Sequence, residues 1–338
     1  MSLKNSLSTF RYFYVSVSVS LLCLSGVFIM TDSWAMVYSA LVLSVLEISF
    51  SFDNAVINAK ILNHMDKIWR KRFLLWGILI AVFGMRFVFP ILLVTLTTKM
   101  GLVDVFHLAF NNPHRYSELL HAGYPLISSF GAGFLFGVFF EFFFSKTKTV
   151  FWVDFLENNR IVRTLSAFYL SPLIFSIVLG IPFLYALHSL ACVMVFVLGV
   201  SCQFLLLLVN KIFSGKLKSN EIIKYGFIGF MYLEVLDASF SFDGVIGAFA
   251  ITTNILIIMV GLGIGAFFVR SLTIYFVEKR VLQSYVYLEH GAHYAILFLA
   301  LCLLMKNFTP ISEVIVAGVS IGLIVLAWLN SVYYVKHK

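Results

Sequence analysis

Charged residues are scarce in this sequence. Of its 338 residues only 12% are Asp, Glu, Lys or Arg, whereas 61% are hydrophobic. A soluble domain carries about 25% charged residues, so the composition excludes an ordinary soluble protein. Apolar runs of about 20 residues recur along the chain, and this length crosses a bilayer as an α-helix. We therefore expect an all-α fold, a polytopic transmembrane helical bundle.

The sequence also lacks the signatures of several other classes of protein. Its four cysteines lie within apolar runs without C-x-x-C spacing, so no disulfide framework or zinc site is indicated. No G-x-x-x-x-G-K-[ST] or H-E-x-x-H sequence occurs, so neither ATP-driven transport nor a zinc-dependent hydrolase is predicted. We expect that the protein is not an enzyme.

Basic residues gather in alternate loops between the apolar runs. Ten spans are predicted, at residues 12–30, 34–59, 73–97, 125–145, 165–186, 188–210, 225–251, 255–277, 289–305 and 311–334. Most Lys and Arg residues lie in the loops at 60–72, 146–164, 211–224 and 278–288. Because cytoplasmic loops carry such an excess, these loops and both termini are predicted to be cytoplasmic. The same rule accounts for the net charge of +8 without a nucleic-acid partner.

Two parts of this topology have a second interpretation. Lys4 and Arg11 precede the first apolar run, as in a cleaved signal peptide. The length of that run and the lack of an A-x-A site favour a retained helix. Around Pro182 and His188, one long helix in place of the predicted hairpin would turn over the second half of the molecule.

Two segments of the sequence match each other across three successive spans. The sequence SFSFD occurs at residues 49–53 and again at 239–243, and an acidic residue (Glu47 or Asp237) stands six positions before each aspartate. Further pairs match in the same order in the next two spans: Gly77 and Arg86 with Gly261 and Arg270, then Gly131-Ala132 with Gly291-Ala292. The two units begin an odd number of spans apart and so enter the membrane from opposite sides. Inverted repeats of this kind are common in secondary transporters.

The repeat divides the chain into five parts. The prediction is an N-terminal helix (1–33), a first three-helix repeat (34–145), loops with a linking hairpin (146–224), a second three-helix repeat (225–306) and a C-terminal helix (307–338).

Eight of the charged residues inside the predicted spans form the candidate set: Glu47, Asp53, Arg86, Glu234, Asp237, Asp243, Arg270 and Glu289. Each costs about 2.5–3.5 kcal/mol if it is central and unpaired, so most must be paired, hydrated or metal-bound. The two arginines are expected to neutralise carboxylates, but the six carboxylates outnumber them. The surplus negative charge predicts a cation, as protons, a metal ion or both.

Helix geometry constrains how these residues meet. A helix turns by about 100° per residue, so Glu47 and Asp53 lie on different faces, whereas Glu47 and Asn54 share one. If both carboxylates reach one site, the helix must unwind or kink near 49–53, and its counterpart near 239–243. Carboxylates, amides and freed carbonyls supply oxygen ligands, which favour Mn²⁺, Mg²⁺ or Ca²⁺.

Polar residues near the ends of the spans and beside this set have more than one interpretation. Glu289 and His293 are four residues apart and share a helix face. They are either interfacial residues or ligands that favour Mn²⁺ or Fe²⁺. Asn58, one turn beyond Asn54, is interpreted as a helix–helix hydrogen bonder, and Glu141 as a residue that snorkels to the cytoplasmic surface.

Three phrases resemble the TerC family of bacterial integral membrane proteins: EISFSFDNAVINA (47–59), EVLDASFSFDGVIGAFAIT (234–252) and YLEHGAHYA (287–295). The resemblance covers about residues 34–305 and is closest to the family's longer branch, once catalogued as a domain of unknown function. It implies a bacterial inner-membrane protein of metal-ion homeostasis, grouped with exporters of the LysE type. Manganese export and tellurium resistance are associated with the family. The family's acidic motif residues fall on Glu47, Asp53, Asn54, Asp237 and Asp243.

The sequence therefore predicts an exporter of divalent cations, with Mn²⁺ favoured and Ca²⁺ or Mg²⁺ as alternatives. We expect alternating access about a midplane site, with proton coupling. Asp53 and Asp243 form the predicted central pair, with Glu47, Asp237 and Asn54 completing the oxygen shell. Six residues are expected to orient these ligands or couple transport: Arg86, Arg270, Glu234, Glu289, His290 and His293. The rival hypothesis is a membrane-protein assembly or insertion factor in which the carboxylates are structural.

Overall fold

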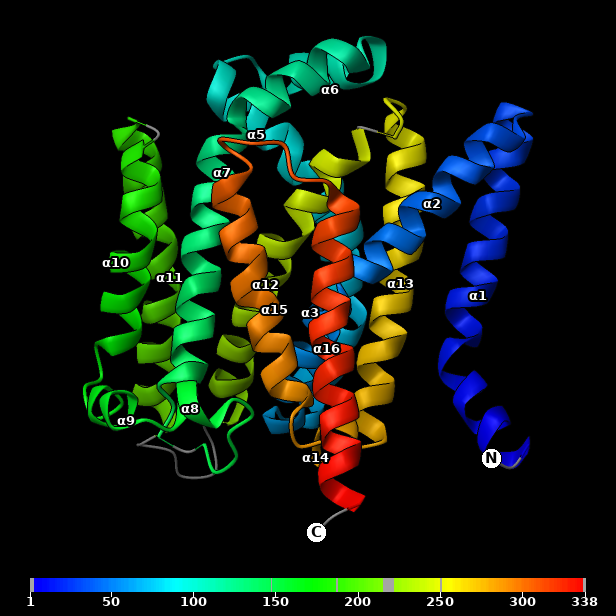
Figure 1. Ribbon diagram of the computed structural model, residues 1–338. Helices are drawn as coiled ribbons and strands as arrows, with labels where there is room; N and C mark the ends of the chain where they lie inside the picture. Colours follow the sequence, from blue (N-terminus) through cyan, green and yellow to red (C-terminus); the bar gives the residue numbers. More distant parts are fainter. Residues whose placement is uncertain (1–2, 147, 187, 215–221, 250, 337–338) are drawn as a thin grey trace.

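The computed structural model describes residues 3–146, 148–186, 188–214, 222–249 and 251–336. Throughout these ranges the secondary structure is helical, without a strand, which confirms the all-α prediction. The long helices lie side by side as a bundle, and α6 (Leu102–Asn111) lies across one end (Figure 1).

A helix occupies each of the ten predicted spans. In chain order they are α1 (Leu3–Thr31), α2 (Trp34–Phe50) with α3 (Phe52–His64), then α4 (Lys67–Arg72), η1 (Phe73–Gly77), η2 (Ile80–Val88) and α5 (Phe89–Thr98) as one run, α7 (Pro113–Phe143), α10 (Ser171–Ala186), α11 (Leu190–Ser214), α12 (Ile222–Phe249), α13 (Ile255–Glu278), α15 (Leu288–Met305) and α16 (Glu313–Lys336). Besides α6, the described residues include the short helices α8 (Asp154–Glu157), α9 (Arg160–Leu165) and α14 (Val281–Ser284).

Among the described residues, seven helical runs are long and apolar enough to cross a membrane, and the bent pair α2–α3 makes an eighth if it is one span. The chain is therefore a multi-pass membrane protein. Within the described residues, α10 is shorter than that threshold, and α12 is not among the seven. The ten-span topology and the inverted repeats stay predictions.

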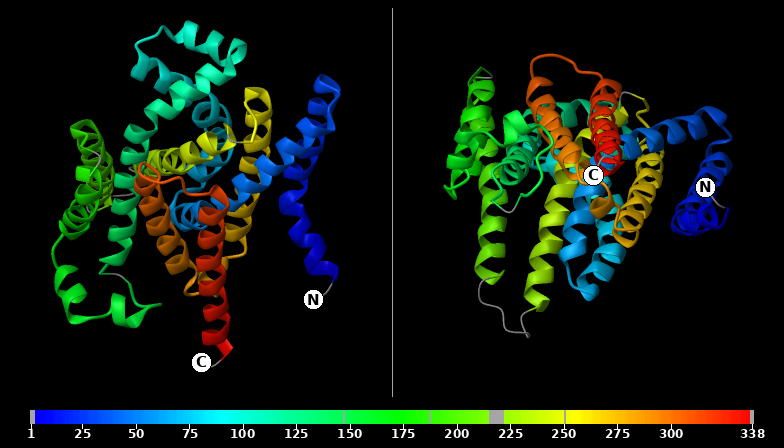
Figure 2. Two further views of the ribbon diagram at one scale, coloured as in Figure 1. Left: turned by 45° about the horizontal axis from the view of Figure 1, so that its top comes forward. Right: turned by 60° about the horizontal axis from the view of Figure 1, so that its bottom comes forward.

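Both chain ends lie at the same end of the bundle, opposite α6 (Figures 1 and 2). The short helices α8, α9 and α14 lie at that end too. We call it the terminus-bearing end. Its predicted assignment to the cytoplasm rests on the distribution of basic residues.

The first SFSFD sequence breaks its helix and the second does not. Between α2 and α3 the chain bends by 51° at Ser51, whose φ and ψ of −98° and 15° leave the helical region. The predicted kink is confirmed there. In contrast, α12 runs without interruption from Ile222 to Phe249, so the predicted second break is wrong. The matched serines make the same bond in both copies, Ser49 Oγ to the carbonyl of Val45 at 2.8 Å and Ser239 Oγ to that of Val235 at 2.9 Å, so this bond does not cause the break.

The third predicted span is wider than an ordinary α-helix. Both η1 and η2 are π-helical, a form found mainly as short bulges at functional sites. Arg86, matched by the repeat to Arg270, lies in η2.

The uncertain hairpin is present as predicted. After α10 the chain turns at His188, whose φ of 52° is left-handed, and returns as α11. The single-helix alternative is therefore wrong.

Glycines bring helix backbones into close contact. A Cβ on Gly133 of α7 would lie 2.3 Å from the carbonyl oxygen of Phe196, and one on Gly199 of α11 would lie 2.2 Å from that of Phe130. Small residues at such crossings are the usual means of packing helices in lipid. Gly261 and Gly265 of α13 similarly lie against α2, and a Cβ on Gly265 would lie 2.5 Å from that of Glu47.

Candidate functional site

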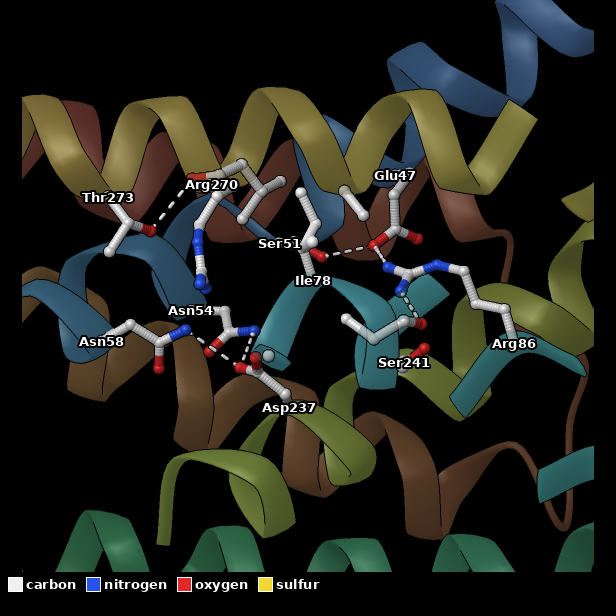
Figure 3. A pocket seen from close by; sticks show the side chains of 14 residues that line it. Glu47, Ser51, Asn54, Asn58, Ile78, Arg86, Asp237, Ser241, Arg270 and Thr273 are labelled. Atoms are coloured by element: carbon white, nitrogen blue, oxygen red, sulfur yellow. Dashed lines mark hydrogen bonds and ion pairs between the residues drawn. The ribbon is translucent and has the colours of Figure 1, made fainter. Parts of the chain in front are cut away.

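A polar cavity of about 40 Å³ lies between the broken helix α2–α3, the π-helical segment, α12 and α13 (Figure 3). A space of this size has room for a few water molecules or one small ion. We call it the central cavity. Its polar lining residues are Glu47, Ser51, Asn54, Asn58, Arg86, Asp237, Ser241, Arg270 and Thr273.

At one side of the central cavity, Glu47 forms an ion pair with Arg86. The two side chains are 2% and 4% exposed. Ser51, at the helix break, donates from its hydroxyl to Glu47 Oε1 at 2.8 Å. Arg86 Nη1 also donates to the carbonyl of Ala81 at 2.5 Å. The Glu47 carboxylate is therefore bound both by Ser51 at the helix break and by Arg86 of the π-helix η2.

At the other side, Asp237 of α12 binds two amides of α3. Its Oδ1 accepts hydrogen bonds from Asn54 Nδ2 at 2.7 Å and from Asn58 Nδ2 at 2.9 Å. A carboxylate requires donors, so each amide presents its nitrogen to Asp237 and keeps its oxygen for another partner. Those two amide oxygens and Ser241 Oγ are buried, and none has a hydrogen-bond partner within the described part of the chain.

Arg270 extends from α13 into the central cavity toward Asn54 (Figure 3). Its guanidinium lies 4.3 Å from the centre of the Phe73 ring, a cation–π contact. The central cavity thus holds the carboxylates of Glu47 and Asp237 and the guanidiniums of Arg86 and Arg270, whose formal charges cancel. Carboxylates were predicted to outnumber arginines within the spans, but the described charged residues that line this cavity are two of each.

The structure brings five predicted site residues to the central cavity: Glu47, Asn54, Arg86, Asp237 and Arg270. Asp53 is not among the described lining residues. It is buried, its Oδ1 accepts the backbone N–H of Asn54 at 2.9 Å, and its Oδ2 has no partner in the described ranges. The side chain of Asp243 lies outside the described residues, so the predicted central pair stays a prediction.

Glu234 lies beside the central cavity, in the wall of an apolar cavity of about 240 Å³. A Cβ on Gly77, which lines the central cavity, would lie 3.0 Å from Glu234 Oε1. Both carboxylate oxygens of Glu234 are buried without a hydrogen bond from any described residue. Glu234 is therefore a buried acid next to the predicted site.

The remaining predicted residues lie at the terminus-bearing end. Glu289 pairs with Lys60 at 2.5 Å. His290 Nε2 lies 2.9 Å from the carbonyl of Val150, and His293 Nδ1 lies 2.7 Å from that of Glu289. The described lining of the central cavity includes none of the three.

Sequence reasoning missed Glu157, whose side chain is fully buried at the same end. It pairs with Lys148 Nζ at 3.0 Å, accepts a hydrogen bond from Tyr294 at 3.0 Å and lies 3.3 Å from His290 Nε2. Burial alone would raise the pKa of Glu157, but the hydrogen bonds and charges of His290 and Lys148 lower it to about 2. Glu157 therefore fixes the 146–164 loop to α15.

Sequence reasoning correctly interpreted Asn58 as a bonder between helices but did not place it in the site. A signal was present, since Glu47, Asn54 and Asn58 are spaced by seven and four residues and share one helix face. Ser51 and Ser241 are also part of the lining, one in each SFSFD copy.

One hydrolase-like pattern occurs in the chain. Gly318-Val-Ser320-Ile-Gly322 matches G-x-S-x-G, but it lies inside the continuous helix α16. The hydrolase motif needs a sharp strand-to-helix turn that exposes the serine. Ser320 is buried, so this match carries no catalytic geometry.

The fold and the site define a multi-pass helical membrane protein with a buried, charge-balanced polar cavity. The chain belongs to the family described as protein of unknown function (DUF475), which matches residues 52–338. No curated protein and no solved structure matches the chain.

Proposed function

We propose that this chain transports a divalent cation across the membrane, as an exporter that uses the central cavity. The observation that carries the proposal is the group of buried oxygens at that cavity. The amide oxygens of Asn54 and Asn58 and the hydroxyl of Ser241 have no partner among described residues, and they adjoin Asp237. Uncharged and carboxylate oxygens together suit hard cations such as Mn²⁺, Mg²⁺ and Ca²⁺. Mn²⁺ is the first choice because of the resemblance to the TerC family.

The two arginines act as internal counterions in this proposal. Across the described residues, no three His, Cys, Asp or Glu side chains gather closely enough to hold a metal. A cation therefore reaches Glu47 only when Arg86 releases it. Exchange of a guanidinium for the transported ion ties binding to movement of the π-helical segment, which is a route to alternating access. Glu234, buried next to the site, is the proposed carrier of a coupled proton.

The two halves of the cavity support the inverted-repeat part of the proposal. Glu47 and Asp237 are matched by the repeat, as are Arg86 and Arg270, and all four line one space. The matched glycines Gly77 and Gly261 also make similar contacts with the opposite repeat. Gly77 lies against Glu234, and Gly261 lies against Leu43, which is next to Ser44, the residue matched to Glu234. The ten spans, the cytoplasmic termini and the bacterial inner membrane are part of this proposal.

Charge balance in the central cavity favours the rival role, a membrane-protein assembly factor with structural carboxylates. Cation uptake into proteoliposomes separates the two. We expect Mn²⁺ movement with the wild type and its loss in Asp237→Asn and Glu47→Gln. Asp53→Asn and Asp243→Asn test the predicted central pair in the same assay. Glu118→Gln is the matched control, because Glu118 is exposed and pairs with Arg115 on the surface. Movement of no cation by well-folded wild type would favour the assembly role.

A further inference from the structure

A second polar cavity, of about 170 Å³, lies at the terminus-bearing end between α3, α7, α11, α12 and α15. Its polar lining residues are Lys60, Glu141, Ser145, Tyr232 and His293. Glu141, expected to snorkel to the surface, instead faces this space.

His293 is held in the orientation that a metal ligand requires. The carbonyl of Glu289 lies 2.7 Å from Nδ1 and can only accept, so in the neutral ring Nδ1 carries the proton. Nε2 then keeps its lone pair. The ring also stacks on Phe142, with 3.8 Å between ring centres and 16° between planes. A backbone carbonyl on one nitrogen and a fixed ring plane are what orient metal-binding histidines elsewhere.

Glu141 is also fixed in orientation. Its Oε2 accepts a hydrogen bond from Gln203 Nε2 at 2.9 Å, and Gln203 is 1% exposed. Gln203 packs against Gly137, where a Cβ would lie 2.7 Å from its Oε1. The second cavity also contains Lys60, whose charge is balanced by Glu289. The charged lining of this cavity is therefore the Glu141 carboxylate and the Lys60 ammonium, and Lys60 is drawn toward Glu289 outside the lining.

The second cavity follows the central cavity along two shared helices. On α3, Asn58 lines the central cavity and Ile57 and Ile61 line the second. On α12, Asp237 lines the central cavity and Tyr232 lines the second. These two residues are five positions apart, which is about 7.5 Å along a helix. The second cavity lies between the terminus-bearing end and the proposed site.

We propose that the second cavity is a further metal site, in which His293 Nε2 and the Glu141 carboxylate bind a divalent transition-metal ion. Two protein ligands, with water in the remaining positions, make a weak site that an ion can leave. One nitrogen ligand favours Mn²⁺ or Fe²⁺ over Ca²⁺ and Mg²⁺. The role of this site as the entry to the central cavity rests on the proposed transport function, but binding itself does not.

Pulsed EPR of Mn²⁺ bound to the full-length protein in nanodiscs tests the inference. A directly bound histidine nitrogen gives a strong ¹⁴N modulation, whereas the described lining of the central cavity offers a metal ion only oxygen ligands, because its amide and guanidinium nitrogens have no free lone pair. We expect the ¹⁴N signal in the wild type and its loss in His293→Gln. Glu141→Gln should weaken this Mn²⁺ site roughly tenfold or more, and its amide oxygen can still accept from Gln203, so the fold is kept.

The experiment separates this inference from the proposed function. Asp237→Asn should keep the ¹⁴N signal while losing transport. A wild type without the ¹⁴N signal at saturating Mn²⁺, or a signal unchanged in both His293→Gln and Glu141→Gln, would overturn the second site. A ¹⁴N signal that depends on His293, together with transport unaffected by Asp237→Asn, would support the second site and overturn the central one.

Discussion

Glu47 of α2 and Arg86 of η2 are ion-paired, and Ser51 at the break between α2 and α3 donates to the same carboxylate oxygen. The pair joins residues 39 positions apart. It connects the bent helix of the first SFSFD copy to the π-helical segment. In the proposed mechanism, Arg86 competes with the transported cation for the carboxylate of Glu47.

This pair should behave as a unit when it is mutated. Glu47→Gln or Arg86→Gln alone leaves a buried charge without its partner, which costs about 3–5 kcal/mol of stability. The double substitution removes both charges and should cost clearly less than the sum. Thermal unfolding of the four proteins in detergent gives the coupling. Additive losses would show that Glu47 and Arg86 act independently.

Asn58 should contribute to both stability and cation binding. Asn58→Ala removes one of the two donors to Asp237 and one unpartnered amide oxygen. Losing a hydrogen bond to a charged group costs about 1.5–3 kcal/mol. We also expect a higher half-saturating Mn²⁺ concentration in proteoliposome uptake.

Thr273→Val is the control for Asn58. Thr273 lines the same cavity, but its hydroxyl bonds the carbonyl of Val269 within α13. Its removal should leave the Mn²⁺ dependence unchanged. A stability loss in Asn58→Ala with wild-type Mn²⁺ dependence would limit Asn58 to a structural role.

The contact between α7 and α11 should be intolerant of a single methyl group. In Gly199→Ala the new Cβ would lie 2.2 Å from the carbonyl oxygen of Phe130, so the helices must separate. Overpacking of this kind costs about 1–3 kcal/mol. Gly318→Ala in α16 has open space around its Cβ, and should be neutral or stabilising by up to about 1 kcal/mol. Equal unfolding temperatures for the two variants would contradict the close packing.

The positions of the helices and half of the central cavity could be predicted from the sequence, because they depend on patterns within the chain. Hydropathy gave the helix ranges, and the repeat paired Glu47 with Asp237 and Arg86 with Arg270. The two SFSFD copies show the limit. Identical residues bend at Ser51 and continue as a helix through the matched Ser241, so packing outside the motif decides the backbone path.

Other parts of the site depend on contacts between distant segments and have no local signal. Glu141 enters a cavity because Gly137 lets Gln203 of α11 approach α7. Glu157 is in a charged loop that reads as solvent-exposed, yet it lies against α15. The π-helical geometry of 73–77 and 80–88 also has no distinctive sequence pattern.

Glu157 should give the fold a specific dependence on pH. The pKa of its carboxyl in the folded protein is lowered to about 2, from an ordinary value of 4.5. A lowered pKa means that the folded state favours the charged form. The resulting stability is present in full above pH 4.5 and is lost progressively as the pH falls toward 2.

Glu157→Gln removes this charge and leaves Lys148 buried opposite an amide. We expect a lower unfolding temperature than that of the wild type near neutral pH, because a buried pair has lost one partner. Below pH 4.5 the two proteins should converge, since the wild-type carboxylate then loses its advantage. Glu118→Gln, at an exposed ion pair, should follow the wild type at every pH. A constant difference between wild type and Glu157→Gln from pH 7 to pH 3 would mean that the charge of Glu157 does not hold the loop against α15.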